Sequence, residues 1–377
     1  MKHQVPIGLI YSTQGTYKHM GTNAYLGALY AIQQINKANS LNIELIADHR
    51  DPKGNLDHYV MAVNDLLAQD IHHIFGTITS SARKEVLPDI QKADGMLWYA
   101  SPYEGYECDE NVVYHGPCPN QNLLPLLSYI IPNYGKRAAL VASNYIWGWE
   151  SNRIASELLS AANGEVVLER CFHLDDLDFS ATISSIIDQS PSFVVNNLVG
   201  ESSYAFLEQL NAQCSQAPLA VLSCNLTECE LSTLPNFTNL KLITAAPFFE
   251  SVNPEFVEKV KNTLGNVPVS AYFMGAYLSI YSYYYSLVKE FTNDTATLRS
   301  TLQSICYPSP TGENLSIAAN QHAILPCYIG LWDNGQFQLL HTKNQSQPNP
   351  FLTAQNFLDV ELLGTLSDTT PTLRLIS

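Results

Sequence analysis

Residues 96–107 read MLWYASPYEGYE, and this stretch decides how the chain folds. Its first five residues are apolar and have the composition of a buried strand, which runs directly into hydroxyl, proline and acidic residues. In open α/β sheets, ligands bind outside the carboxyl ends of the strands, where polar residues of this kind gather. A second polar stretch, VYHGPCPNQN at residues 113–122, follows closely. Together the two stretches predict a pocket for a small polar ligand at a strand end.

Strand-like and helix-like segments alternate on both sides of this stretch. Apolar runs of five to eight residues are separated by segments whose apolar residues recur every three or four positions, as on an amphipathic helix. Strands that alternate with helices indicate a parallel sheet covered on both faces. The pattern starts twice, so the fold class we predict is α/β, with two doubly wound parallel-sheet lobes. The expected strands lie at 5–11, 43–47, 71–75, 138–142, 166–172, 193–198 and 219–223, with a closing hairpin at 324–340.

The chain length supports this division, because 377 residues are too many for one ordinary core. Breaks in the pattern lie near 118–123, 244–249 and 325–331, and they predict three crossings between the lobes. We therefore expect lobe 1 to comprise residues 1–120 and 247–327, and lobe 2 residues 121–246 and 328–377. Three crossings form a hinge, and a hinge between two lobes closes on a ligand.

Composition and charge exclude several functions. The net charge is −16 with only 19 Lys and Arg, and no cationic cluster suitable for nucleic acid is present. No apolar run reaches the roughly 18 residues that a membrane span needs, so we expect no membrane insertion. The chain begins with MKHQ and enters the first strand at once, which favours a cytoplasmic protein. The alternative is a periplasmic protein from which a signal peptide has been removed.

The cysteines bear on the same question. Eight are scattered along the chain, several within apolar runs, and none forms a paired metal-ligand motif. Reduced thiols in a cytoplasmic protein are the favoured interpretation. If the protein is exported, Cys224 and Cys229 or Cys108 and Cys118 are the pairs that could form disulfides.

No motif indicates catalysis, a metal or a cofactor. Ser80, His115 and Asp51 could be imagined as a triad, but no G-x-S-x-G sequence places a nucleophile on a sharp turn. His72 and His73 are adjacent, and adjacent strand residues point to opposite faces, so both cannot bind one ion. No phosphate-binding glycine motif is present. We therefore expect a protein that is not an enzyme and that needs neither cofactor nor metal.

Short motifs along nearly the whole chain carry a resemblance to a known family. The motifs are Tyr25-x-Gly27-Ala28, Asp51-Pro52, Ser80-x-x-Arg83-Lys84, Tyr99-x-x-Pro102-Tyr103-Glu104-Gly105, Val113-Tyr114-x-Gly116-Pro117, Pro119-Asn120-Gln121-Asn122, Glu228-x-Glu230, Ala246-Pro247-Phe248-Phe249 and Asn320-x-His322. Through them the sequence resembles the type I periplasmic-binding-protein family of branched-chain amino acid, urea and amide receptors. The likeness is greatest to the amide sensors that negatively regulate aliphatic amidase operons.

The resemblance implies a ligand site between the lobes. It places Ser80 at a helix N-terminus, where its hydroxyl and the free backbone N–H groups suit the carbonyl oxygen of a small amide. It places Tyr99 and Pro102 on the first-lobe wall, with the Pro102 carbonyl available to an amide N–H, and Tyr145 on the second-lobe wall. Taken singly, Ser80 could only cap its helix and each tyrosine could only pack in a core. The expected lining also includes Ile78, Thr79, Ser101, Trp147 and Leu198.

Two of these positions differ from the amide sensors. Ile78 replaces an aromatic residue, and Trp147 stands where a tyrosine is expected, so the ligand could be acetamide, another short amide, urea or a related compound. The resemblance implies a cytoplasmic sensor that holds an RNA-binding antiterminator protein silent and so regulates an amidase operon. The alternative is the substrate-binding component of an ABC transporter, whose partner is a permease and whose ligand is an amide, urea or a branched-chain amino acid. A homodimer is an open alternative for its assembly.

Overall fold

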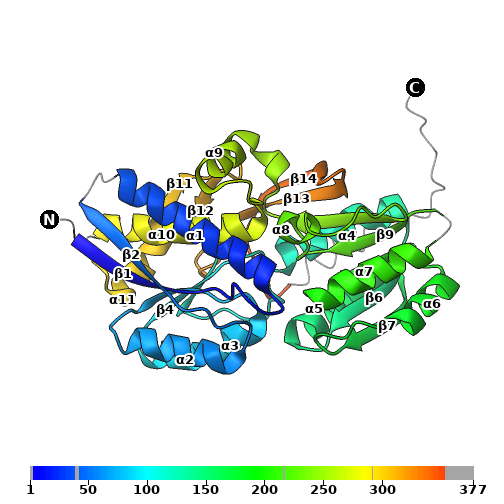
Figure 1. The fold of residues 1–377 in the computed structure, drawn as a ribbon, viewed down its shortest axis with the longest axis horizontal. Helices are drawn as coiled ribbons and strands as arrows, with labels where there is room; N and C mark the ends of the chain where they lie inside the picture. Colours follow the sequence, from blue (N-terminus) through cyan, green and yellow to red (C-terminus); the bar gives the residue numbers. More distant parts are fainter. Residues whose placement is uncertain (1–2, 39–41, 215–216, 291, 353–377) are drawn as a thin grey trace.

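The structure is a computed structural model that describes residues 3–38, 42–214, 217–290 and 292–352. Two α/β lobes lie side by side along the long axis of the molecule (Figure 1). Each contains a largely parallel sheet with helices on both faces, as the alternating pattern predicts. The predicted fold class is therefore confirmed.

The first lobe is built on five parallel strands in the order β2-β1-β3-β4-β5. Neighbouring strand residues face opposite sides of the sheet. Ile74 packs toward α2 and α3, whereas Phe75 packs toward α1 and α10. The strands are β1 (His3–Ile10), β2 (Ile43–His49), β3 (His73–Gly76), β4 (Met96–Tyr99) and β5 (Val112–Tyr114), with a small hairpin of β11 (Cys306–Pro308) and β12 (Asn314–Ser316). The helices are α1 (Lys18–Ala38), α2 (Leu56–Leu67), α3 (Ser80–Lys92), α9 (Pro254–Leu264), α10 (Ala271–Glu290) and α11 (Thr295–Thr301).

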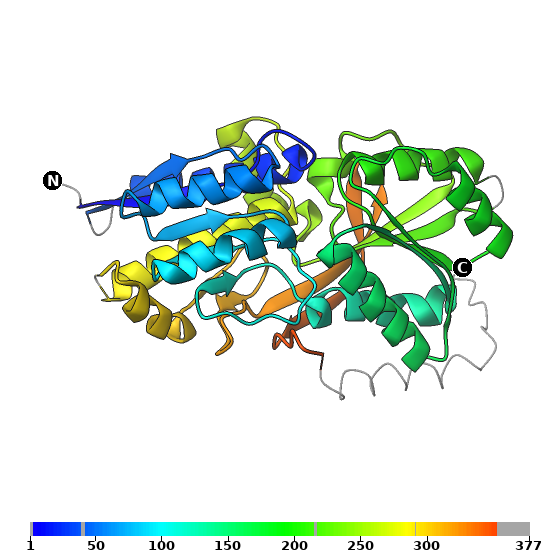
Figure 2. The ribbon, with the colours of Figure 1, turned by 90° about the horizontal axis from the view of Figure 1, so that it is seen from below.

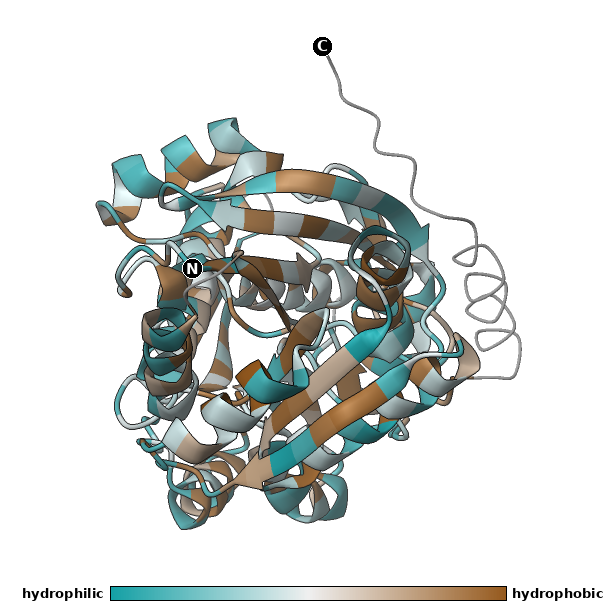
Figure 3. Cartoon of the chain, turned by 90° about the vertical axis from the view of Figure 1, so that its right-hand side faces the viewer, coloured by the Kyte–Doolittle hydropathy of each residue, from teal (hydrophilic) through white to brown (hydrophobic). Residues whose placement is uncertain are grey.

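The second lobe has seven strands in the order β14-β13-β10-β9-β8-β6-β7, of which β13 and β14 form an antiparallel edge. Its strands are apolar along much of their length (Figure 3). Leu140 faces α4 and α5, whereas Val141 faces α6 and α7. The strands are β6 (Arg137–Ser143), β7 (Glu165–Phe172), β8 (Phe193–Asn197), β9 (Leu219–Ser223), β10 (Leu240–Ala246), β13 (Leu325–Asp333) and β14 (Gln336–Ser346). The helices are α4 (Leu123–Tyr134), α5 (Ile146–Ala161), α6 (Ser180–Gln189), α7 (Glu201–Gln213) and α8 (Glu228–Leu231). The chain also has short 3-10 helices outside this lobe's sheet and helices. They are η1 (Pro119–Gln121), which precedes α4, and η2 (Glu250–Val252) and η3 (Leu302–Ser304), which follow β10.

Both parallel sheets have the same strand order, since β7-β6-β8-β9-β10 repeats β2-β1-β3-β4-β5. Each sheet thus has a switch point, between β1 and β3 and between β6 and β8, where the connections diverge to opposite faces. The chain passes between the lobes after β5, after β10 and before β13, and the connections run through the middle of the molecule (Figure 2). The lobe boundaries after residues 120, 246 and 327 stay a prediction, and residues 353–377, assigned to lobe 2, lie outside the described residues.

All eight cysteines lie within the described residues, and all are free thiols. Cys118, Cys224, Cys229 and Cys327 are buried, and burial raises the pKa of the Cys118 and Cys327 thiols to about 12. Within the described ranges, no helix has both the length and the apolar character needed to cross a bilayer.

Candidate ligand site between the lobes

A pocket lies where the carboxyl ends of the strands of the two lobes face each other. It encloses about 310 Å³, part of it open to solvent. Most of its lining follows directly after β1, β3, β4, β6, β8 or β9, which is the position that doubly wound sheets give to ligands. The lining residues are Tyr17, Met20, Ile78, Thr79, Ser80, Ser101, Pro102, Tyr145, Trp147, Val199, Asn225 and Tyr272.

The first-lobe wall begins where β3 gives way to α3. Gly76 has φ +142°, and a Cβ there would meet Ile10 atoms at 2.6 Å, so only glycine permits this turn. Thr79 caps α3, and its hydroxyl accepts the Ala82 N–H at 3.2 Å. The cap leaves the N–H group of Ser80 at the open end of the helix, beside the pocket. This end of the pocket therefore offers backbone donors to a ligand.

The second-lobe wall is formed by α5 and by two loops. Tyr145 is the N-cap residue of α5 and is half-buried, while Trp147 lies one residue beyond the start of the helix. Val199 follows β8 and Asn225 follows β9. Trp147 and Val199 pack into the hydrophobic core of the first lobe, so the two lobes are closed on each other.

One hydrogen bond joins the lobes inside the pocket. Tyr272 belongs to α10 in the first lobe, and its hydroxyl donates to the backbone carbonyl of Asn225 in the second lobe at 3.1 Å. The Asn225 side chain is held in turn, since its amide nitrogen donates to the Leu198 carbonyl at 3.2 Å and its amide oxygen accepts from Ser223 at 2.6 Å. Asn225 is thus held in place from both lobes.

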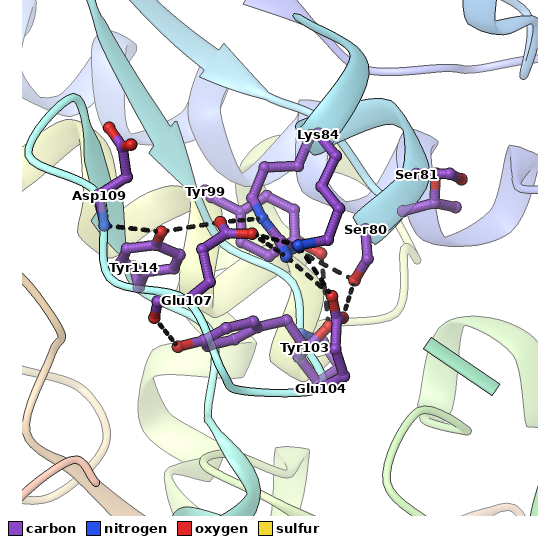
Figure 4. A network of polar contacts seen from close by, with 12 residues as sticks. Ser80, Ser81, Lys84, Tyr99, Tyr103, Glu104, Glu107, Asp109 and Tyr114 are labelled. Carbon is purple, nitrogen blue, oxygen red and sulfur yellow. Dashed lines mark hydrogen bonds and ion pairs between the residues drawn. The ribbon is translucent and has the colours of Figure 1, made fainter. Parts of the chain in front are cut away.

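A buried ion cluster lies directly behind the first-lobe wall (Figure 4). Arg83 is fully buried, and its guanidinium donates to Glu104 at 3.2 Å and to Glu107 at 2.8 Å. The same guanidinium lies 4.6 Å from the ring centre of Tyr99 and 4.9 Å from that of Tyr103. Burial is the largest single influence on Arg83 and opposes its charge, but Glu104, Tyr99 and Glu107 together outweigh it and raise the pKa of Arg83. Burial is likewise the largest single influence on Glu107, but Arg83 and Lys84 together outweigh it and lower the pKa of that carboxyl to about 2.

Ser80 belongs to this cluster as well as to the pocket. Its hydroxyl donates a short hydrogen bond to Glu104 and accepts one from Arg83 at 3.2 Å. A hydroxyl has one proton. In the structure this proton is directed to Glu104, so donation from this hydroxyl to a ligand carbonyl would have to compete with Glu104, and that expected role stays a prediction.

Of the nine residues predicted for the site, seven line the pocket and two lie one layer behind it. Tyr99 is fully buried, and its hydroxyl donates to the carbonyls of Ile78 and Pro102 at 3.3 and 3.4 Å. Tyr99 therefore supports the wall from behind instead of forming it. Its hydrogen bond occupies one of the two lone pairs of the Pro102 carbonyl oxygen. Leu198 is fully buried in the core of the second lobe, because the side chain of its neighbour Val199 takes the pocket-facing direction.

Five lining residues were not predicted: Tyr17, Met20, Val199, Asn225 and Tyr272. Val199 and Asn225 follow predicted strands within two residues, so the strand-end argument could have found them. Tyr17, Met20 and Tyr272 lie in or next to helices, and nothing in their local sequence separates them from core residues.

Among the residues that the structure describes, no charged side chain lines this pocket. Its polar groups are hydroxyls, one carboxamide and backbone atoms, and its apolar groups are aromatic and aliphatic. Burial raises the pKa of Tyr145 and of Tyr272 well above the usual value, so both phenols are neutral. The pocket is thus largely apolar, and the polar groups in its lining are uncharged.

The histidines and Asp51 take structural positions. His115 bonds Ser282 through Nε2 at 2.8 Å, and Asp51 accepts from Thr13 at 2.7 Å, so neither contacts Ser80. His72 bonds the Ala93 carbonyl, whereas His73 bonds that of Asn293, on opposite sides of the sheet. Among the described residues, no three His, Cys, Asp or Glu side chains gather in a way that could hold a metal ion.

Comparison with known proteins agrees with this geometry. The sequence matches the family described as periplasmic binding protein domain over residues 5–356. The chain belongs to this family. The family is one of binding proteins, and the chain is a small-molecule binding protein and not an enzyme.

Several solved structures share the fold. The amino acid ABC transporter substrate-binding protein of Pseudomonas fluorescens Pf-5 has a TM-score of 0.78 at 19% identity, covering 93% of this chain and 98% of its own. A solute-binding protein of an ABC transporter from R. palustris, in complex with benzoate, has a TM-score of 0.81 at 15% identity, covering 92% and 98%. The branched-chain amino acid transporter substrate-binding protein of Streptococcus pneumoniae, in complex with isoleucine, has a TM-score of 0.76 at 15% identity. The match covers 92% of this chain and 100% of that protein. At these identities the likeness establishes the fold.

Proposed function

We propose that the chain is a receptor for a small, uncharged ligand of the amide or urea class, bound between the lobes. The observation that carries this proposal is the absence of any charged side chain from the pocket lining, beside hydroxyl, carboxamide and backbone groups. The pocket's empty volume of about 310 Å³ includes open solvent, so its enclosed part suits only a molecule of few heavy atoms.

Charged ligands fit this pocket poorly. Burying an ammonium or a carboxylate without an opposite charge costs several kcal/mol, even after relaxation. Isoleucine and benzoate, the ligands of two structural neighbours, each carry such a charge. Amides and urea carry none, and they present donors and acceptors side by side. The predicted residues Ile78, Thr79, Ser80, Ser101, Pro102, Tyr145 and Trp147 are proposed as direct contacts, and Tyr99 and Leu198 as support.

For its cellular role, we propose the substrate-binding component of an ABC transporter, acting in the periplasm with a permease partner. Support comes from the family and from the neighbours, whose names describe substrate-binding proteins of ABC transporters. A cytoplasmic location and a homodimer find no support among the comparisons.

One observation favours the second candidate, a cytoplasmic amide sensor that controls an antiterminator protein. All eight cysteines are free thiols, and Cys108, Cys171 and Cys306 are exposed. Exposed thiols persist best in a reducing compartment. Thiol labelling of denatured protein freshly isolated without reductant tests this, because eight reactive thiols favour the sensor and two or more protected thiols favour export.

The ligand class is tested by calorimetry and thermal shift with acetamide, propionamide, urea, isoleucine and benzoate. We expect the amides or urea to bind and to raise the melting temperature, since they stabilise the folded state by mass action. Binding of isoleucine or benzoate, with no response to any amide or to urea, would overturn the proposal.

A further inference from the structure

The buried ion cluster fixes how Ser80 can be used by a ligand. Ser80 lines the pocket, while Glu104 is buried behind it and is not among the lining residues. The Ser80 hydroxyl donates to Oε2 of Glu104, and Nη1 of Arg83 donates to the Ser80 oxygen at 3.2 Å. These two contacts use the single proton and one of the two lone pairs. What remains for the pocket is one lone pair.

We propose that Glu104 is a specificity-determining positioning residue that makes Ser80 an acceptor, so that the ligand must present an N–H donor at this end of the pocket. This inference rests on the proposed function and deepens it. The backbone N–H of Ser80, at the start of α3, supplies a donor beside that acceptor. A primary amide or urea has a carbonyl oxygen and an N–H side by side and satisfies both. A ketone, an ester or a carboxylate lacks the N–H.

The orientation cannot reverse while the cluster is intact. Nη2 of Arg83 donates to Oε1 of Glu104 at 3.2 Å, and Lys84 lies 3.6 Å from the same oxygen. Both cations lie beside Glu104, and a carboxylate accepts hydrogen bonds only. The guanidinium is buried between Glu104 and Glu107 and offers donors only. The Tyr99 phenol also lies within hydrogen-bonding reach of Ser80, but a carboxylate is the stronger acceptor, so the Ser80 proton stays directed to Glu104. Figure 4 shows Ser80 and Glu104 pointing toward each other at the edge of this cluster.

Glu104→Gln reverses the polarity of Ser80 with little change in shape. Arg83 offers donors only, so the Gln oxygen stays toward its Nη2 and the amide nitrogen faces Ser80. That nitrogen donates to the Ser80 oxygen, and the hydroxyl proton is released toward the pocket. The variant should accept a ligand that offers only an acceptor.

Glu107→Gln is the matched control. Glu107 also pairs with Arg83, at 2.8 Å, and the variant removes the same charge from the same cluster. Its carboxylate contacts neither Ser80 nor the pocket lining. A loss of cluster stability alone would therefore affect both variants, whereas a change in Ser80 polarity affects only Glu104→Gln.

The probes are acetamide and acetone, which have nearly the same shape and differ in the N–H₂ group. For the wild type and Glu107→Gln we expect calorimetry to give at least about tenfold tighter binding of acetamide, because the unmatched acceptor disfavours acetone. In Glu104→Gln the preference should fall about tenfold, the equivalent of one hydrogen bond. An unchanged preference in folded Glu104→Gln would overturn the role of Glu104 while leaving the proposed function intact. If the wild type binds neither acetamide nor urea, the proposed function fails and this inference fails with it.

Ser80→Ala provides a second test if Glu104→Gln does not fold. If Ser80 only accepts, the variant weakens acetamide binding and does not weaken acetone binding, because the unmatched acceptor that disfavours acetone is gone. If its hydroxyl donates to the ligand, binding of both probes weakens, which would overturn the inference.

Discussion

The Tyr272 hydroxyl donates to the backbone carbonyl of Asn225 at 3.1 Å, and this bond joins α10 of the first lobe to the loop after β9 of the second. Both residues line the pocket. A bond that exists only when the lobes are together adds its free energy to the closed state and so to ligand affinity.

Tyr272→Phe removes this bond and keeps the ring. We expect affinity for an amide or urea probe to fall by about 0.5–1.5 kcal/mol, which corresponds to one net hydrogen bond. Calorimetry measures the affinity, and small-angle scattering measures the fraction of closed molecules at saturation. Tyr283→Phe is the control, because Tyr283 lies on the same helix but bonds Asn293 within the first lobe. Equal affinity losses in the two variants would show that the interlobe bond has no role in closure.

Gly200 lies where the two lobes touch each other. It precedes α7 in the second lobe with φ +58°, and a Cβ there would lie 2.6 Å from the Thr16 carbonyl oxygen of the first lobe. Thr16 also donates to Asp175 at 3.0 Å across the same boundary. This contact leaves no room for any side chain when the lobes are closed.

Gly200→Ala should therefore hinder closure. The positive φ costs about 1–2 kcal/mol of folding stability with any side chain, and the interlobe clash comes on top of it in the closed state alone. Gly265→Ala shares the backbone strain, since Gly265 has φ +86° with no atom within 4 Å of its Cβ direction. We expect similar losses of unfolding free energy in both variants, and at least about tenfold weaker ligand binding in Gly200→Ala only. Normal affinity in Gly200→Ala would contradict a closed, ligand-holding state of this geometry.

Tyr145 tests the second-lobe wall. Tyr145→Phe removes one hydroxyl from a half-buried side chain in the lining and should weaken amide binding by about 0.5–1.5 kcal/mol if the ligand bonds there, as we expect. Tyr134→Phe, a half-buried tyrosine of α4 outside the pocket, is the control. Unchanged calorimetric affinity in Tyr145→Phe would remove this hydroxyl from the proposed contacts.

The sheets could be predicted from the sequence because their strands are short apolar runs bounded by breaks. Residues 219–223 and 43–49 are examples, and both lie in the expected sheet. Helix α4 could not be predicted in the same way. Its sequence, LLPLLSYIIPNY, is buried on most sides and includes Pro125 and Pro132, so it lacks the polar face that reveals helical spacing.

The pocket was predictable only where a wall residue follows its own strand. Thr79, Ser80, Ser101 and Pro102 meet this condition. Tyr272 does not, because it reaches the pocket only through closure against the other lobe. The orientation of the Ser80 hydroxyl depends on Glu104, 24 residues away in the chain, and no local pattern encodes it.

Two buried glutamates on α8 lie next to the first lobe. Oε1 of Glu228 accepts the Glu250 N–H at 2.8 Å, and Oε1 of Glu230 accepts the Tyr204 hydroxyl at 2.9 Å. Within the described residues, the second oxygen of each carboxyl has no protein partner. Burial raises the pKa of both to about 8, and the Lys261 ammonium compensates Glu228 only weakly. The folded chain thus holds two protons at neutral pH that the unfolded chain releases near pH 4.5.

These glutamates set the alkaline limb of the stability profile. Between about pH 4.5 and 8 the folded state binds more protons than the unfolded state, so the free energy of unfolding falls as pH rises. Burial lowers the pKa of His73 and His322 to about 4, so these groups destabilise the fold as pH falls below about 6.5. Burial also lowers the pKa of His115 to about 3, so three histidines outweigh the two glutamates below about pH 6.5. We therefore expect maximal stability near pH 6.5, and Glu230→Gln should recover about 3 kcal/mol at pH 8 relative to pH 5, compared with the wild type. Urea unfolding across this range measures the effect. Glu255→Gln, at an exposed position, is the control, and equal alkaline slopes in all three proteins would contradict the prediction.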